Sequence, residues 1–155
     1  HEFEEYLIPG GFAEFFNKDV LKIKRKDVLP IDKPAIFWIN MLLVWILLPI
    51  GGLLSIINIK LGIWMYYFII FQAIGHLVLG LKGKRIINPG MITSWLIHTP
   101  FAIWMLNLLF SQKIITNQLN IHLLIGFIVN ALLPLLGFGP FKFSLMNRYK
   151  RRIKK

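Results

Sequence analysis

Four long apolar runs, separated by short charged stretches, constrain this chain more than any other feature of its sequence. They cover approximately residues 35–57, 61–81, 91–111 and 119–138. A helix needs about 20 mostly apolar residues to cross the hydrocarbon core of a bilayer, and each run has that length. The sequence therefore predicts an all-α fold: a polytopic transmembrane helical bundle with four full spans and a short N-terminal helix, in one membrane domain over residues 1–155.

The composition agrees with a membrane domain. Only 16% of the residues are charged, whereas a soluble domain carries about 25%. The net charge of +11 could indicate nucleic-acid binding, but basic segments beside apolar spans are the ordinary signature of membrane topology. No RNA-binding motif of basic and aromatic residues occurs, so we expect no nucleic-acid partner. The chain has no cysteine, which excludes disulfides, thiolate metal sites and a Cys nucleophile.

The basic residues predict how the spans are oriented. Sixteen of the eighteen Lys and Arg residues lie in the charged loop 18–33, in the loop 82–90 and in the basic tail 139–155. Because positively charged loops stay in the cytoplasm, we expect these three segments on the cytoplasmic side of the plasma (inner) membrane. Membrane lipids are the expected partners. The tail should contact anionic lipid, since each charge near such a surface contributes about 1 kcal/mol.

The connections between the runs are short and carry turn residues. Residues 58–60 alone join the first two runs, which predicts a tight helical hairpin. Pro49 lies inside the first run, and we expect a kink there because a proline removes one backbone hydrogen bond. Asn88 precedes Pro89 in the 82–90 loop. An Asn can cap a helix start and a proline fits the first helical position, so we expect a helix start capped by Asn88.

Ionisable groups are rare within membrane helices, so their positions matter. At a rise of about 1.5 Å per residue, His76 lies roughly 9 Å and His98 roughly 12 Å inside the predicted cytoplasmic boundary. Other polar side chains in the runs include Gln72, Ser94, His122 and Asn130. They belong to stripes at a spacing of four, which keeps side chains on one helix face. That pattern is typical of close packing and interhelical hydrogen bonds. His122 lies at the opposite boundary.

The acidic residues are confined to the start of the chain, where all seven precede residue 33. Of these, Glu4 and Glu5 follow His1 at the spacing i+3 and i+4, which places the three side chains on one helix face. A histidine with one or two carboxylates can bind Zn²⁺ or a non-haem metal, and it can equally act as an acid and a base. The same spacing suits the solvated face of a surface helix. The spacing alone leaves these interpretations open.

Two blocks of the sequence carry a resemblance to a known family. The first is His1-Glu2-Phe3-Glu4-Glu5, followed by Tyr6 and Pro9-Gly10. The second is Gln72-Ala73-Ile74-Gly75-His76-Leu77, followed by Lys84-Arg85, Asn88-Pro89-Gly90, Thr93 and Pro100. Together they resemble the HXXEE-domain family of integral membrane proteins, which is named for the first block and often has an Asn where this chain has Gln72.

The resemblance covers essentially the whole chain. In the family the motif follows apolar residues, which implies that the N-terminal helix is the end of a longer span. The resemblance also implies a functional site that contains His1, Glu4, Glu5 and His76. It implies no particular activity.

Two classes of function fit these features. In the first, the chain is a metal-dependent membrane-embedded enzyme that acts on a lipid-like or amphipathic substrate near the cytoplasmic face. Its ion, Zn²⁺ or non-haem iron, would lower the pKa of a bound water, and Glu4 or Glu5 would be the catalytic base. The candidate ligands are His1, Glu4, Glu5, His76 and His98. In the second class, the chain is a small transporter, a proton-coupled carrier or an accessory membrane subunit, because His–Glu clusters also serve proton relays.

Overall fold

The structure, a computed structural model, describes residues 1–22, 31–117 and 121–132. Within these ranges every regular element is a helix, as predicted. Three helical stretches there are long and apolar enough to cross a membrane; they are Ala35–Ile57, Ile59–Gly83 and Met91–Ser111. They correspond to the first three predicted spans. The all-α class is therefore confirmed.

The predicted fourth span is described only in part. Its described portion is the helix Ile121–Leu132, which is shorter than a bilayer crossing requires. The remainder of the run 119–138 and the basic tail lie outside the described residues. The count of four spans therefore stays a prediction.

The first and third spans share an irregularity before a proline. The first consists of α3 (Lys33–Ile39), η2 (Asn40–Leu47) and α4 (Leu48–Ile57), and the third of α6 (Met91–Thr93), η4 (Ser94–His98) and α7 (Thr99–Ser111). The π-helical segment η2 ends two residues before Pro49, and η4 ends two residues before Pro100. A proline cannot donate to the carbonyl four residues earlier, and its ring crowds that carbonyl. A wider π-helical turn accommodates this interruption. The distortion expected at Pro49 takes this form.

A tight hairpin joins the first two spans, as predicted. The second span consists of η3 (Ile59–Gly62) and α5 (Trp64–Gly83). Asn58 between the spans has an extended backbone, and its side-chain oxygen accepts a hydrogen bond from the Lys60 N–H at 3.0 Å. The two arms approach closely, because a Cβ on Gly62 would lie 2.7 Å from the Cβ of Ser55.

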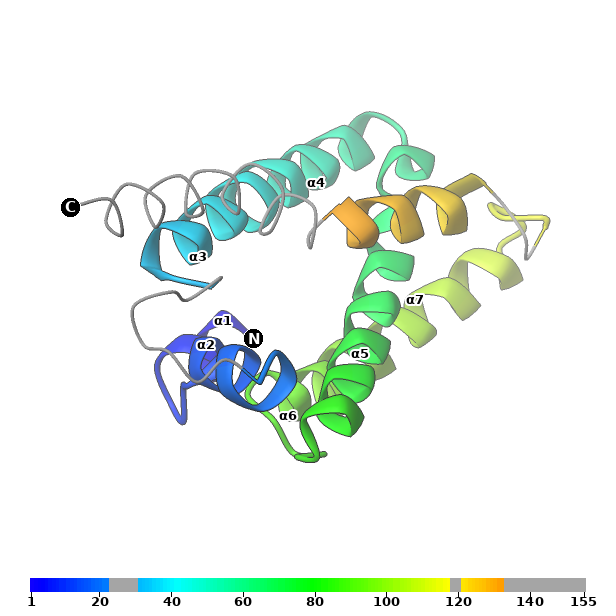
Figure 1. The fold of residues 1–155 in the computed structure, drawn as a ribbon. Coiled ribbons are helices and arrows are strands. Elements are labelled where there is room, and N and C mark those ends of the chain that lie inside the picture. Colours follow the sequence, from blue (N-terminus) through cyan, green and yellow to red (C-terminus); the bar gives the residue numbers. More distant parts are fainter. Residues whose placement is uncertain (23–30, 118–120, 133–155) are drawn as a thin grey trace.

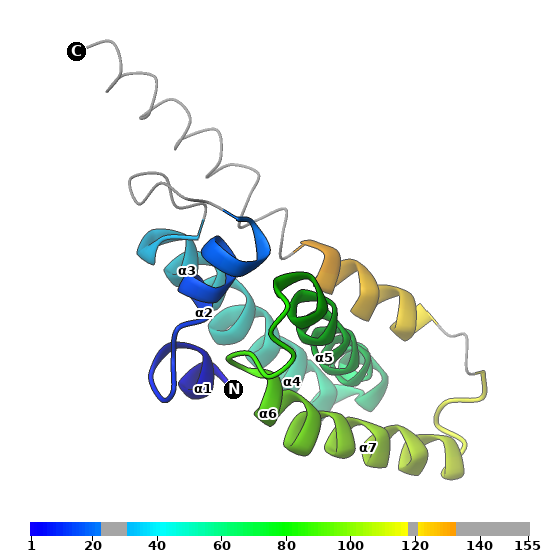
Figure 2. The ribbon, with the colours of Figure 1, turned by 60° about the horizontal axis from the view of Figure 1, so that its bottom comes forward.

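Among the described residues, three short helices precede the first span; they are α1 (Glu2–Tyr6), α2 (Phe12–Glu14) and η1 (Phe15–Val20). Figure 1 and Figure 2 show them at one end of α5, near α6. The helix η1 packs so closely on α5 that a Cβ on Gly83 would lie 2.7 Å from the Phe15 ring. The N-terminal segment, the loop after α5 and the start of the third span therefore meet at the same end of the bundle.

The centre of the bundle is α5, which packs against α7, η4 and η1. Ile63 and Leu109 are buried in the cluster between the second and third spans. On the outside, large apolar side chains such as Trp45, Leu96 and Trp104 are exposed. Contiguous apolar surface of this kind is rare on soluble monomers, and it suits contact with lipid.

Candidate metal centre

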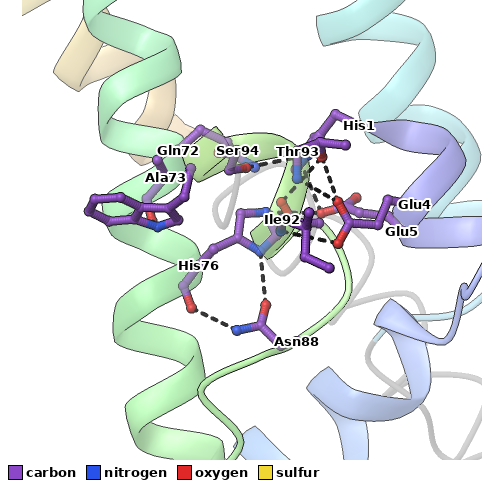
Figure 3. A network of polar contacts seen from close by, with 12 residues as sticks. His1, Glu4, Glu5, Gln72, Ala73, His76, Asn88, Ile92, Thr93 and Ser94 are labelled. Carbon is purple, nitrogen blue, oxygen red and sulfur yellow. Dashed lines mark hydrogen bonds and ion pairs between the residues drawn. The ribbon is translucent and has the colours of Figure 1, made fainter. Parts of the chain in front are cut away.

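Three side chains from two distant parts of the chain converge beside α5. His1 and Glu5 belong to the N-terminal segment and His76 to α5 (Figure 3). One ligand atom from each residue lies within 4.8 Å of the other two. Glu5 Oε1 is 3.3 Å from His1 Nε2 and 3.1 Å from His76 Nε2. Glu5 and His76 are buried. We call these three residues the His/Glu triad.

Asn88 sets the orientation of the His76 ring. Its amide nitrogen donates to the backbone carbonyls of His76 and Ile86, both at 3.0 Å. Its Oδ1 is therefore the atom that faces His76 Nδ1, also at 3.0 Å, and Nδ1 carries the proton. In the neutral ring of His76, Nε2 then carries a lone pair, which points toward Glu5. The prediction that the Asn88 side chain caps a helix is wrong, because Gly90 is the N-cap residue of α6 and the Asn88 amide donates to His76 and Ile86 instead.

Thr93 orients the His1 ring in a similar way. Its hydroxyl donates to Glu4 Oε2 at 2.7 Å, so the same oxygen is an acceptor toward His1 Nδ1 at 3.0 Å. The Ser94 hydroxyl lies 3.3 Å from that ring nitrogen. With Nδ1 protonated, the neutral ring of His1 also turns an Nε2 lone pair toward Glu5.

The facing atoms of the triad have no hydrogen-bond partner. They are His1 Nε2, His76 Nε2 and Glu5 Oε1, and all three are buried. Buried acceptors that face one another without a donor are costly. A positive charge between them removes this cost, and it can be a metal ion or a proton on the imidazoles. Metal-bound histidines characteristically donate their other ring N–H to a protein oxygen, and both histidines of the triad do so.

Gly90 forms the floor of the triad. A Cβ at this position would lie 2.6 Å from His76 Cε1 and 2.8 Å from both Glu5 Oε1 and His1 Cε1. Its φ of +89° is also in the left-handed region that favours glycine. Only a residue without a side chain lets the three ligand atoms meet here.

Glu4, predicted as a ligand or a base, does not join the triad. Its carboxylate accepts hydrogen bonds from the Ile92 N–H at 3.1 Å and from the Thr93 N–H at 2.8 Å, in addition to the Thr93 hydroxyl. These are orphan donors of a helix start, which a carboxylate satisfies well. Burial alone would raise the pKa of Glu4, but the hydrogen bonds from Thr93 and Ile92 outweigh it and lower this pKa.

Glu2 is a residue that the sequence reasoning missed. Its Oε2 is buried without a hydrogen-bond partner, and its side chain lines the same cavity as Glu5 and His76. Burial, followed by the charge of Glu5, raises the pKa of Glu2 to about 7. On a helix Glu2 lies about 100° away from its neighbour His1. The helical spacing that groups His1, Glu4 and Glu5 therefore does not include Glu2.

The carboxylate of Glu5 is held as an anion. Burial by itself would raise the pKa of Glu5, but when His1 and His76 are protonated, their hydrogen bonds and positive charges outweigh burial and lower this pKa to about 2. Burial would lower the pKa of His1, yet the neighbouring carboxylates, Glu5 first, raise it above the ordinary value of 6.5. Burial and the charge of Glu5 raise the pKa of the Tyr6 hydroxyl. That hydroxyl stays protonated and can donate to Glu5.

His98 lies beside the triad rather than in it. Its ring centroid is 5.3 Å from that of His1, but it is not in the group of candidate ligand atoms among the described residues. The Ser94 hydroxyl, predicted to serve packing and interhelical hydrogen bonds, contacts the His1 ring. Both residues thus flank His1, a candidate ligand, from the third span.

The remaining polar residues lie on the helix Ile121–Leu132 and its contact with α5. Asn130 donates to Gln72 Oε1 at 3.1 Å, an interhelical hydrogen bond of the kind that their stripes predicted. His122, in the first turn of that helix, is outside the candidate ligand group. These residues are therefore not members of the triad, although Gln72 and Asn130 line the same cavity as Glu5 and His76.

Comparison with known proteins identifies one family. The family described as "Protein of unknown function with HXXEE motif" has a model that matches residues 1–105. This range includes the triad and the residues that orient it. No curated protein and no solved structure matches the chain. The chemistry of the site must therefore be argued from its own geometry.

Proposed function

We propose that this chain, which belongs to the HXXEE family, is a membrane-embedded hydrolase that acts through a divalent metal ion held by the His/Glu triad. One observation carries the proposal. Three buried ligand atoms face one another within 4.8 Å, and none has a hydrogen-bond partner. A cation fits this arrangement better than any neutral group does.

The donor set narrows the choice of metal. Two imidazoles and one carboxylate are a known ligand set of catalytic zinc, in which a further position takes water. The same set forms the facial triad of non-haem iron. We favour Zn²⁺ because hydrolysis needs only water as its co-reactant. Iron remains the alternative that metal analysis distinguishes.

The expected reaction is hydrolysis of an ester or amide. A bound metal lowers the pKa of its water to about 7. A metal held by His1, Glu5 and His76 would activate this water for attack on the carbonyl carbon. As the bond from that carbon to the leaving oxygen or nitrogen breaks, Glu2 would take the water proton and pass it to the leaving atom. Glu2 suits this role because its buried Oε2 has no hydrogen-bond partner and it lines the cavity beside the triad. Glu4 does not, since its carboxylate caps α6.

Metal analysis tests the proposal. The full chain would be purified in mild detergent, and its bound metals measured by elemental analysis. We expect about one ion per chain, as in a mononuclear site. His76→Ala and Glu5→Ala should each reduce the content to background without loss of helical circular dichroism. The matched control is His122→Ala, which removes a histidine outside the triad.

Two results would overturn the proposal. One is a wild-type chain that binds no metal at any added concentration of Zn²⁺ or Fe²⁺. The other is metal content that His76→Ala leaves unchanged. Either result would favour the non-enzymatic alternative, a proton-coupled carrier or accessory subunit in which the triad exchanges protons.

For the orientation in the membrane, we propose that the triad end of the bundle faces the cytoplasm. This is supported by the basic residues of the 18–33 and 82–90 loops. Because the chain has no cysteine, single cysteines report accessibility cleanly. Ile87→Cys and Thr116→Cys, both at exposed positions, should be labelled from opposite sides of sealed vesicles. Labelling of both from the same side would exclude this orientation.

A further inference from the structure

A cavity with a volume of about 450 Å³ borders the triad. Its walls come from the N-terminal segment, the first span, α5 and the helix Ile121–Leu132. Small-molecule sites have volumes of about 300–1,000 Å³ and are mostly apolar with a few polar groups. The cavity agrees with this description, since apolar side chains such as Leu43, Phe71 and Phe127 make up most of its wall.

The unsatisfied polar atoms of the wall gather in one place. Glu2 and Glu5 come from α1, and His76 lies 3.1 Å from Glu5. Each contributes a buried atom without a hydrogen-bond partner. A ligand in the cavity therefore meets unsatisfied polar groups at the triad.

The other polar side chains of the wall are already engaged. Asn130 donates to Gln72, and Asn40 interacts with the Tyr6 hydroxyl. These pairs present little unsatisfied polarity to a ligand. Away from the triad the cavity thus offers an apolar surface, which suits a hydrocarbon chain.

Charge determines which polar end fits. Glu5 lines the cavity as an anion and Glu2 lines it beside Glu5, so a negatively charged head group would be repelled unless a metal ion or protonated imidazoles compensate. A neutral carbonyl group avoids this repulsion, and its oxygen can approach a cation between the histidines.

We propose that the cavity holds the acyl chain of the substrate, and that the substrate is a neutral acyl ester or amide whose carbonyl group lies at the triad. The reaction part of this inference rests on the proposed hydrolase. The binding part stands on the cavity and is tested without metal. The acyl chain would reach the cavity from the surrounding lipid, since the first span and α5 both belong to helices that are long and apolar enough to cross a membrane.

Gly75 offers a clean way to block the cavity. It lines the wall, and a Cβ there would meet no atom within 4 Å. Gly75→Leu therefore places a side chain in open space rather than in a packed core. Gly52→Leu is the matched control, because a Cβ on Gly52 also meets no atom within 4 Å and Gly52 does not line the cavity.

The probe is a monoacylglycerol with a diazirine near the end of its acyl chain, photocrosslinked to the full chain in detergent with a chelator present. We expect crosslinks on lining residues such as Leu43 and Phe71. Gly75→Leu should reduce them by at least about tenfold, the size of effect that one or more methylenes cause in an apolar pocket. Gly52→Leu should leave them unchanged.

Further arms separate the sources of the signal. A diazirine fatty acid should label the metal-free chain less than the monoacylglycerol does, because the anionic carboxylate of Glu5 lines the cavity and repels the fatty-acid carboxylate. Crosslinks that Gly75→Leu does not reduce, or a fatty acid that labels more strongly, would overturn the inference. Gly75→Leu should still bind metal, because it fills the cavity without removing a member of the triad. If the wild type binds no metal but still gives crosslinks that Gly75→Leu reduces, the proposed hydrolase is rejected and the acyl-chain cavity is supported.

Discussion

Glu4 and Thr93 lie 89 positions apart in the sequence, and together they hold the N-terminal segment to the third span. The Thr93 N–H and hydroxyl both donate to Glu4 Oε2, at 2.8 and 2.7 Å. The Thr93 hydroxyl also accepts from the His1 ring. The contact that anchors the segment therefore also orients a candidate ligand of the metal.

Replacing Glu4 should affect both stability and metal binding. Glu4→Ala leaves the N–H groups of Ile92 and Thr93 without their acceptor, and hydrogen bonds to a charged group contribute about 1.5–3 kcal/mol each. We expect a loss of at least about 1 kcal/mol in the free energy of unfolding, together with weaker Zn²⁺ binding in a competitive titration. Glu14→Ala, at the exposed ion pair with Lys18, should change neither quantity measurably. Equal effects of the two variants would contradict the anchoring role.

The Glu4 contact should also make stability depend on pH. The pKa of Glu4 is lower in the folded protein than its ordinary value of 4.5. Its stabilising contribution is therefore complete above that value and is lost as the pH falls through the folded-state pKa. In metal-free protein, the unfolding midpoints of wild type and Glu4→Gln should converge over the acid range below pH 4.5, as the pH falls through the lowered pKa of Glu4. A difference that stays constant across this range would show that the carboxylate charge is not involved.

Asn88 should control metal affinity through the His76 ring. Asn88→Ala removes the acceptor that fixes the His76 Nδ1–H. Loss of a hydrogen-bond partner of a metal-binding histidine typically lowers metal affinity by about 10–100-fold. Asn88→Asp keeps an acceptor facing Nδ1 and should lose less. Titration with Zn²⁺ against a chromophoric chelator measures both. Asn58→Ala, which removes the cap of η3 at the hairpin, serves as the control and should bind the ion normally.

Gly90 and Gly11 provide a matched pair of backbone positions. Both have φ near +90°, at +89° and +91°, so an alanine strains the backbone equally at either position, by about 1–2 kcal/mol. Only at Gly90 does the added Cβ also meet the triad, at 2.6–2.8 Å; at Gly11 it meets no atom within 4 Å. Gly90→Ala should abolish metal binding and Gly11→Ala should preserve it. Elemental analysis of both variants decides whether the floor of the triad is as tight as the structure shows.

The spans could be predicted because their signal is local. Each of the first three apolar runs is long enough to satisfy its own backbone as a helix in lipid, and this needs no knowledge of its neighbours. The tight hairpin followed equally from the few residues between two runs. The grouping of His1 and Glu5 also followed from local helical spacing. The prediction that His76 joins His1 and Glu5 needed the charge pattern and the family resemblance, because these placed all three residues at one end of the bundle.

The roles of the individual polar side chains were decided only by the tertiary structure. Glu4 has the same local spacing as Glu5, yet Glu4 caps α6 while Glu5 faces two histidines. Asn88 precedes a proline, as a helix cap would, yet its side-chain amide forms hydrogen bonds across the loop with His76. Glu2 stands off the predicted face but lines the cavity with the triad. The physical reason is that sequence determines which groups a segment carries and along which face. Which of those groups meet a donor, a lone pair or a cavity depends on partners brought by other segments.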